Sequence, residues 1–186
     1  MKLFFSFFGI LVLQRLIELL IAKRNEQWMK AQGAIEFGKV HYRLMVIMHT
    51  LFFLVFLVEV VYLEKTLSMA WSSLLFLFLL AQAGRIWALT SLGRFWNTKI
   101  IVLPNSKVVR KGPYQYIKHP NYAIVMVEFL VIPLLFNAYI TAALFTLLNI
   151  GILAIRIPAE EQALATLTEY RIVFSQSNRF SPKNVK

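Results

Sequence analysis

Five long apolar stretches, separated by short polar segments, set the limits on what this chain can fold into. They cover residues 3–22, 44–63, 69–89, 122–136 and 138–155. The first is 20 residues long, which is the length that an α-helix needs to cross the hydrocarbon core of a bilayer. A helix satisfies its backbone hydrogen bonds internally, as hydrocarbon requires. The sequence therefore predicts an all-α, polytopic membrane protein with about five transmembrane helices.

A cleaved secretory signal peptide is the alternative for the N-terminal apolar run. The run is long for a signal peptide, ends in Lys23 and Arg24, and lacks a small-residue cleavage site. We therefore expect a retained helix. Within it, Arg15 and Glu18 lie three residues apart on one helical face, and we expect them to pair inside the protein.

The fourth apolar run, residues 122–136, is short for a full crossing at a rise of 1.5 Å per residue. It either begins earlier, near Pro120, or lies tilted against its neighbour. Runs four and five then form either two crossings or a hairpin that does not fully cross. We expect Pro133 to kink or end the fourth helix, because proline has no amide hydrogen to donate.

Basic residues gather in three of the polar segments. Residues 23–43 carry five Lys or Arg, residues 84–120 carry seven with no acid, and the tail 156–186 carries five, whereas residues 64–68 carry one. Because Lys and Arg accumulate in cytoplasmic loops, the three basic segments are predicted to lie in the cytoplasm and the N-terminus outside. No repeat or flexible linker divides residues 1–186, so we expect a single integral-membrane domain.

Composition excludes several classes of function. The chain has no cysteine, so disulfides, thiolate metal sites and cysteine nucleophiles are excluded. His41 and His49 lack a third ligand at metal spacing, and we expect no metal site. The net charge is +11, and the charged residues lie mainly between the apolar runs. This pattern favours contact with an anionic membrane surface. We therefore expect membrane lipids, and no nucleic acid, as partners. The oligomeric state stays open.

The segment Lys111–Tyr122 combines turn-forming prolines with tyrosines and a histidine at the edge of the fourth apolar run. Proline is favoured at the first position of a helix, so His119 is expected at the helix N-terminus, before Pro120. Free backbone N–H groups there attract carboxylates, and tyrosine faces attract cations. S-adenosylmethionine, which has an amino-acid tail and a sulfonium, fits this environment. The alternative is an interfacial belt of aromatic and basic residues.

A second polar motif follows the fifth apolar run, with Arg156 four residues before Glu160 and Glu161. Pro158 is expected to open a new helix and so to disfavour one continuous helix through the motif. The motif is either a functional site or a structural one. In the structural case, Arg156 and Glu160 form an ion pair, or one of the two acids stabilises the positive N-terminal end of a helix.

Two acids lie within apolar runs and invite a functional hypothesis. Glu128 is expected either to reach the site or to pair with Arg85. Glu59 lies near the outer end of its run and is expected to extend its carboxylate toward the interface.

The order and spacing of these motifs resemble the signature of the isoprenylcysteine carboxyl methyltransferase family. The resemblance rests on Gly-Pro-Tyr-x-Tyr-x-Lys-His-Pro-Asn-Tyr at 112–122 and Arg-x-x-x-Glu-Glu at 156–161. The family has arginine before His-Pro and usually glycine after the tyrosine, where this chain has Lys118 and Ala123. Residues 92–96 and 101–104 are similar to its bacterial branch. The resemblance implies a membrane fold of five or more helices and a bacterial cytoplasmic membrane, with the active site facing the cytoplasm.

The resemblance also implies roles for individual residues. Arg156 corresponds to the arginine that orients the methyl acceptor. Lys118, Glu161 and Glu128 are further possible site residues. S-adenosylmethionine is the implied cofactor, with contacts from Lys107, Val108, Val109, Tyr114, His119, Pro120, Asn121, Tyr122 and Glu160.

The implied reaction is direct transfer of a methyl group from the sulfonium to an acceptor oxygen. We expect O-methylation of a lipid-like small molecule, such as an alkylpyrone or a similar enol or phenol. Carboxyl methylation of a prenylated cysteine is the alternative within the family. A non-catalytic membrane scaffold or transporter is the alternative from another class, with Glu59 and Glu128 on a transport path.

Overall fold

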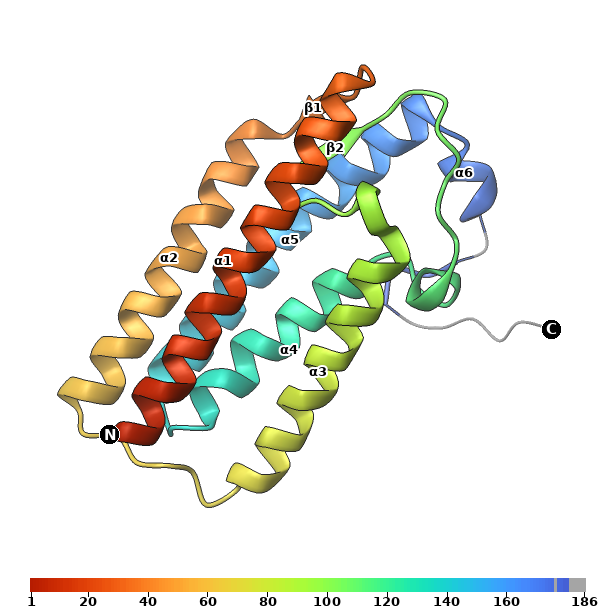
Figure 1. Cartoon of the computed structure of the whole chain (residues 1–186). Helices are drawn as coiled ribbons and strands as arrows, with labels where there is room; N and C mark the ends of the chain where they lie inside the picture. Colours follow the sequence, from red (N-terminus) through yellow and green to blue (C-terminus); the bar gives the residue numbers. More distant parts are fainter. Residues whose placement is uncertain (176, 181–186) are drawn as a thin grey trace.

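The computed structural model shows a bundle of five helices with a small assembly of short strands, short helices and loops at one end (Figure 1). It describes residues 1–175 and 177–180, so the end of the expected cytoplasmic tail, residues 181–186, lies outside the described residues. The bundle consists of α1 (Lys2–Ala31), α2 (Lys39–Tyr62), α3 (Trp71–Leu92), α4 (Pro120–Leu134) and α5 (Tyr139–Leu167). The other elements are β1 (Ile35–Phe37), η1 (Gly93–Phe95), β2 (Ile100–Val102), η2 (Gly112–Gln115) and α6 (Tyr170–Val173).

The expected helical membrane fold is confirmed. Four helices, α1, α2, α3 and α5, are long and apolar enough to cross a membrane, and α4 is apolar but has only 15 residues. Helix α4 begins at Pro120 and ends one residue after Pro133, in agreement with the role expected of the two prolines. Helices α1 and α5 extend beyond their apolar runs and carry polar residues past the apolar part of the bundle.

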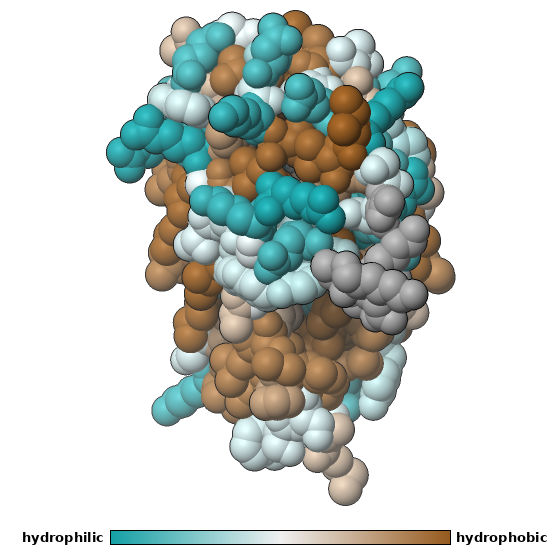
Figure 2. All heavy atoms as spheres, turned by 90° about the vertical axis from the view of Figure 1, so that its right-hand side faces the viewer, coloured by the Kyte–Doolittle hydropathy of each residue, from teal (hydrophilic) through white to brown (hydrophobic). Residues whose placement is uncertain are grey.

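Strands β1 and β2 form a short antiparallel ladder in which Ile35 pairs with Val102 and Phe37 with Ile100. The ladder, α6 and the long connection between α3 and α4 lie at one end of the bundle, and the N-terminus lies at the other (Figure 1). We call the first the ladder end. Hydrophilic residues gather over this end, and a hydrophobic band covers the bundle below it (Figure 2). The three basic segments of the sequence thus come together at the ladder end.

The expectation that Pro158 opens a new helix is wrong, because α5 runs through it without a break. An interior proline costs about 3 kcal/mol in an exposed helix, so other contacts must hold this segment. The turns of α5 beyond Pro158 pack Ala163 against Ile100 and Val102 of the ladder. This packing stabilises the helix beyond the proline. Arg156 and Glu160 therefore lie one turn apart on one helical face.

Glu59 does not extend toward the interface as expected. Its side chain is buried at the N-terminus of α5, where its carboxylate accepts hydrogen bonds from the amides of Ile140 (3.1 Å) and Thr141 (2.7 Å) and from the Thr141 hydroxyl (2.6 Å). The first amides of a helix have no partner within the helix and carry a partial positive charge, so a carboxylate stabilises them. Glu59 thus joins α2 to the start of α5.

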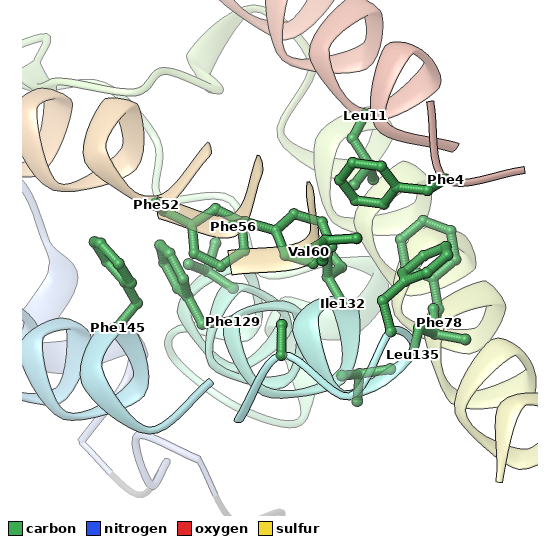
Figure 3. Packing of buried hydrophobic residues seen from close by; sticks show 14 of the residues in the cluster. Phe4, Leu11, Phe52, Phe56, Val60, Phe78, Phe129, Ile132, Leu135 and Phe145 are labelled. Atoms are coloured by element: carbon green, nitrogen blue, oxygen red, sulfur yellow. The ribbon is translucent and has the colours of Figure 1, made fainter. Parts of the chain in front are cut away.

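Phenylalanines fill the half of the bundle away from the ladder (Figure 3). Phe56 is fully buried, and the rings of Phe52 and Phe129 meet edge to face with centroids 4.7 Å apart. Edge-to-face pairs add about 0.5–1.5 kcal/mol beyond the area that they bury. This core fixes α1, α2, α4 and α5 against one another and leaves the opposite end free to carry cavities.

A buried network of charges lies between this core and the ladder end. Arg15 and Arg85 contact the carboxylates of both Glu18 and Glu128, with Arg85 Nη1 3.2 Å from Glu18 and Arg15 Nη1 2.7 Å from it. Gln82 donates to Glu128 at 2.7 Å. The two arginines and two glutamates balance in charge, as buried ions must. The expected pairs of Arg15 with Glu18 and of Arg85 with Glu128 are both present.

Candidate functional site

Two adjoining cavities lie at the ladder end. The loop chamber, of about 150 Å³, lies among β2, the segment 103–109, η2, the last turns of α5, and α6. The bundle chamber, of about 130 Å³, lies deeper, among the helices. Both are lined by Tyr114, Lys118, His119 and Glu160. The two chambers therefore share a wall built from both sequence motifs.

The loop chamber brings together residues that the family resemblance assigned to the cofactor. Lys107, Val108, Val109 and Tyr114 all line it. Tyr114 is positioned by the turn at Gly112, whose φ of +59° favours glycine. A Cβ at that glycine would lie 1.9 Å from Ser91 Oγ, so no other residue fits there without displacing α3.

His119 immediately precedes α4, as predicted, and its side chain is buried. Its Nε2 lies 3.0 Å from Glu161 Oε1, and Arg179 Nη2 donates to the other oxygen of Glu161 at 2.6 Å. The hydrogen bond to Glu161 raises the pKa of the already strongly basic Arg179, so this partner stays charged. The His119 ring also stacks against Tyr122, with centroids 5.4 Å apart. Glu161 thus positions His119, which lines both chambers.

Tyr122 connects the two motifs. Arg156 Nε donates to the Tyr122 hydroxyl at 2.8 Å, and this hydroxyl donates to the carboxylate of Glu160. Arg156 Nη2 donates to the carbonyl of Thr98 at 2.6 Å. In the described part of the chain, Arg156 and Glu160 are joined through the tyrosine rather than by the direct ion pair considered from the sequence. The result is a fixed chain of hydrogen bonds from the bundle chamber to the wall that it shares with the loop chamber.

Two tyrosines in the loop chamber stay protonated. Burial and the carboxylate of Glu160 raise the pKa of Tyr114, and burial with Glu161 and Glu160 raises the pKa of Tyr170. The Tyr170 hydroxyl is buried and has no hydrogen-bond partner among the described residues. It is a free donor in the loop chamber, and no role was predicted for it from the sequence.

The bundle chamber contains several buried polar atoms that lack a partner among the described residues. They are Trp96 Nε1, Asn121 Oδ1, Asn149 Nδ2 and Arg156 Nη1. Leaving a buried polar group unpaired costs about 1–3 kcal/mol, so most such groups in native proteins have a partner. Their gathering in one cavity indicates a place where a polar ligand binds. Trp96 and Asn149 were not identified from the sequence.

An apolar groove leads from the lipid-facing side of α1 and α2 toward the bundle chamber. We call it the lateral groove; its volume is about 440 Å³ and its walls include Leu16, Val46, Phe53 and Leu54. It shares five lining residues with the bundle chamber, namely Arg15, Glu18, Met45, His49 and Thr98. The lateral groove and the bundle chamber therefore adjoin, with these five residues between them.

The remaining predicted residues take other places. Pro120 starts α4 but lines neither chamber, and Asn121 lines only the bundle chamber. Glu128 lines neither chamber, because the two arginines of the buried network hold it. Within residues 1–175 and 177–180, no cluster of three potential metal ligands occurs.

Comparison with known proteins places this site in a family. The family model for the isoprenylcysteine carboxyl methyltransferase (ICMT) family matches residues 74–166, which include every motif of the site from Trp96 to Glu161. The chain is 48% identical to the uncharacterised protein YpbQ of Bacillus subtilis over 162 residues, which cover 87% of this chain and 96% of that protein. It is 31% identical to an uncharacterised protein of Haemophilus influenzae over 163 residues, covering 86% and 94% of the two chains.

Proposed function

The chain belongs to the isoprenylcysteine carboxyl methyltransferase family, and from this premise we propose that it is an S-adenosylmethionine-dependent O-methyltransferase of lipid-like acceptors. The proposed acceptor is an alkylpyrone or a similar enol or phenol. The protein is an integral membrane protein, and the basic residues at the ladder end favour a cytoplasmic position for the site. The bacterial relatives support a bacterial cytoplasmic membrane as its location.

The residues of the loop chamber fit S-adenosylmethionine. The free hydroxyl of Tyr170 and the carboxylate of Glu160 are partners for its polar groups, and the face of Tyr114 suits its cationic sulfonium. Ile100, Val102 and Leu164 offer an apolar wall for an adenine ring. When bound, the cofactor supplies an electrophilic methyl group on sulfur.

The observation that carries the proposal is the hydrogen-bonded chain from Arg156 through Tyr122 to Glu160. It fixes an arginine of the bundle chamber relative to a carboxylate of the shared wall. Methyl transfer without a covalent enzyme intermediate requires mainly that two reactants are held in line and away from water. The chain of hydrogen bonds provides such a fixed relation between the two chambers.

Arg156 is suited to hold the acceptor oxygen. Its Nε and Nη2 are occupied by Tyr122 and Thr98, which lock the guanidinium, and its Nη1 is buried without a partner among the described residues. A guanidinium donates charge-assisted hydrogen bonds to an oxyanion. Arg156 thereby keeps an acceptor oxygen in its anionic, nucleophilic form, while the surrounding helices exclude water.

The lateral groove supports a lipid-like acceptor. Its apolar walls suit an alkyl tail, and its inner end meets the bundle chamber. A substrate that enters from the bilayer would place its tail in the groove and its oxygen near Arg156.

The rival hypothesis of a transporter relies on free acids within the bundle. Glu59 is engaged by three hydrogen bonds at the start of α5, and Glu128 is held by two arginines. Both carboxylates have structural partners, so neither offers a vacant site for a transported ion. This arrangement favours the methyltransferase.

Equilibrium binding of S-adenosylmethionine to detergent-solubilised protein tests the proposal. We expect binding without added metal, and we expect Glu160→Gln and His119→Ala to weaken it by about tenfold, the usual effect of losing a hydrogen bond to a charged group. Glu64→Gln, an exposed acid at the other end of the bundle, is the matched control and should change nothing. Absence of binding, or unchanged binding in both site variants, would overturn the proposal.

A further inference from the structure

We propose that Trp96 and Asn149 are acceptor-binding residues which, together with Arg156, make the bundle chamber selective for an anion with two oxygens. This inference rests on the proposed function and specifies the class of acceptor. A suitable ligand is an acidic enol conjugated to a carbonyl, or a carboxylate, because both spread one negative charge over two oxygens.

The first support is the chemistry of the unpartnered atoms. Trp96 Nε1, Asn149 Nδ2 and Arg156 Nη1 are all N–H donors, and each of these three side chains belongs to a residue that is only 2% exposed. Nitrogen donors of tryptophan and arginine cannot accept a hydrogen bond. A hydroxyl oxygen that keeps its proton has two lone pairs and accepts at most two hydrogen bonds, fewer than the three that these donors offer. The fourth unpartnered atom of the chamber, Asn121 Oδ1, is an acceptor, so donors outnumber acceptors by three to one and fit a ligand with several lone pairs.

The second support is the way that α5 presents these groups. Asn149, Leu153, Arg156 and Glu160 recur at helical spacing, and all four line the bundle chamber. Asn149 is the one polar member of this stripe within the apolar run 138–155, where a side-chain amide is costly unless it is paired. Arg156 stands two turns further along the same face. The two side chains therefore line the same cavity from one rigid element.

Trp96 reaches the chamber from a segment that is fixed to α1. Asn25 Nδ2 donates to the carbonyl of Trp96 at 2.7 Å, and Asn97 Nδ2 donates to the carbonyl of Ala22 at 3.1 Å. The next residue, Thr98, accepts the hydrogen bond from Arg156. The indole and the guanidinium are thus positioned by the same short segment, so their donors keep a constant separation.

The charges around the chamber agree with an anionic ligand. Arg15, Glu18 and Arg85 also line it, but they belong to the buried network in which the positive and negative charges balance. Lys118 and Glu160 line it too and offset each other in charge, and Lys99 pairs with Glu26. Arg156 has no direct carboxylate contact among the described residues, since the Tyr122 hydroxyl lies between it and Glu160. A ligand with one negative charge would neutralise Arg156, as a buried arginine requires.

Binding of acceptor probes in the presence of S-adenosylhomocysteine tests this inference separately from catalysis. The probes are a 6-alkyl-4-hydroxy-2-pyrone, a farnesylated cysteine analogue and a 3-alkylphenol with the alkyl chain of the pyrone, at about pH 8, where the phenol keeps its proton. We expect the protein to bind at least one of the two anions more tightly than the phenol. The pyrone and the cysteine analogue distinguish an enolate from a carboxylate as the natural ligand.

The variants Asn149→Leu and Trp96→Phe remove one donor each. Each should weaken binding of the preferred anion by about tenfold and change phenol binding by about twofold or less. Asn149→Leu should not lower the melting temperature, because it replaces an unpaired buried amide by an apolar group. Thr146→Val is the matched control, since Thr146 Oγ1 is also buried and unpartnered among the described residues but lies outside the chamber.

Equal weakening of anion and phenol would show that Trp96 and Asn149 only shape the cavity, and it would overturn the inference. Unchanged anion binding in both variants, or no binding of any probe to the parent protein, would overturn it as well. Selective anion binding without methyl transfer would instead contradict the proposed function and leave this inference standing.

Discussion

The two ends of the bundle treat buried polar groups in opposite ways. Away from the ladder, phenylalanines pack edge to face, and the buried carboxylate of Glu59 has three donors around it. At the ladder end, donors on Trp96, Asn149 and Arg156 are buried without a partner among the described residues. At the first end the Glu59 carboxylate is satisfied as it stands, whereas the three donors at the second would gain partners from a bound ligand. One end therefore stabilises the fold, and the other gives up stability for binding.

The largest expected effect is on stability, at the phenylalanine end. Phe56→Ala should cost about 3–5 kcal/mol, because Phe56 is fully buried and its removal leaves a cavity. Thermal unfolding in detergent would show this as a strong loss of melting temperature. Phe5→Ala is the matched control, since Phe5 lies in α1 at the phenylalanine end of the bundle but is 50% exposed. Equal losses in the two variants would contradict the packing account.

The next largest effect is on transfer, at the ladder end. Arg156→Ala should lower methyl transfer by about 10²–10³-fold, the usual effect of removing a group that stabilises an oxyanion. Cofactor affinity should change little, because Arg156 lines the bundle chamber and not the loop chamber. Arg156→Lys should restore only part of the activity, since an ammonium does not reproduce the planar guanidinium. Loss of cofactor binding in Arg156→Ala would refute the role at the acceptor.

A pair of glutamate variants separates the stabilising role of one end from the binding role of the other. Glu59→Gln should destabilise the protein by about 0.5–2 kcal/mol through a weaker contact with the start of α5, and should leave cofactor affinity unchanged. Glu160→Gln should weaken cofactor binding with little change in melting temperature. The measurements are thermal unfolding and cofactor titration on the same samples. The distinction between the ends fails if both variants lose stability and affinity together.

The smallest expected effect comes from a test of which end of the bundle faces the cytoplasm. Single cysteines at positions 99, 111 and 65 can be labelled without background, because the chain has no cysteine. We expect positions 99 and 111, at the ladder end, to react from the cytoplasmic side and position 65 from the other side. Labelling of 99 and 65 from the same side would contradict the proposed topology.

The sequence predicted the helices well, since an apolar run of about 20 residues leaves a chain in a membrane few alternatives to a helix. It failed at Pro158, where the local rule against proline was overridden by packing of α5 on the ladder. The ladder itself was missed because its two strands have three residues each and lie far apart in the chain. Pairings between distant segments leave no periodic signal.

The candidate site was predicted in part. The motifs around His119 and Glu160 indicated a shared location, and the structure brings them to one wall. Trp96, Asn149 and Tyr170 were missed, because their importance lies in unpaired polar atoms that only a three-dimensional structure reveals. Asn149 carried one local signal, as the one side-chain amide within the fifth apolar run.

The decisive measurement is the transfer of labelled methyl from S-adenosylmethionine to a hydroxypyrone in proteoliposomes. The parent protein is compared with Tyr122→Phe. We predict that the parent protein methylates the pyrone. We predict that Tyr122→Phe slows turnover by about tenfold, while KM for each substrate changes much less, because the lost hydroxyl joins Arg156 to Glu160 and so fixes the two chambers relative to each other. No transfer to the pyrone, a phenol or a farnesylated cysteine by protein with bound cofactor would contradict the account.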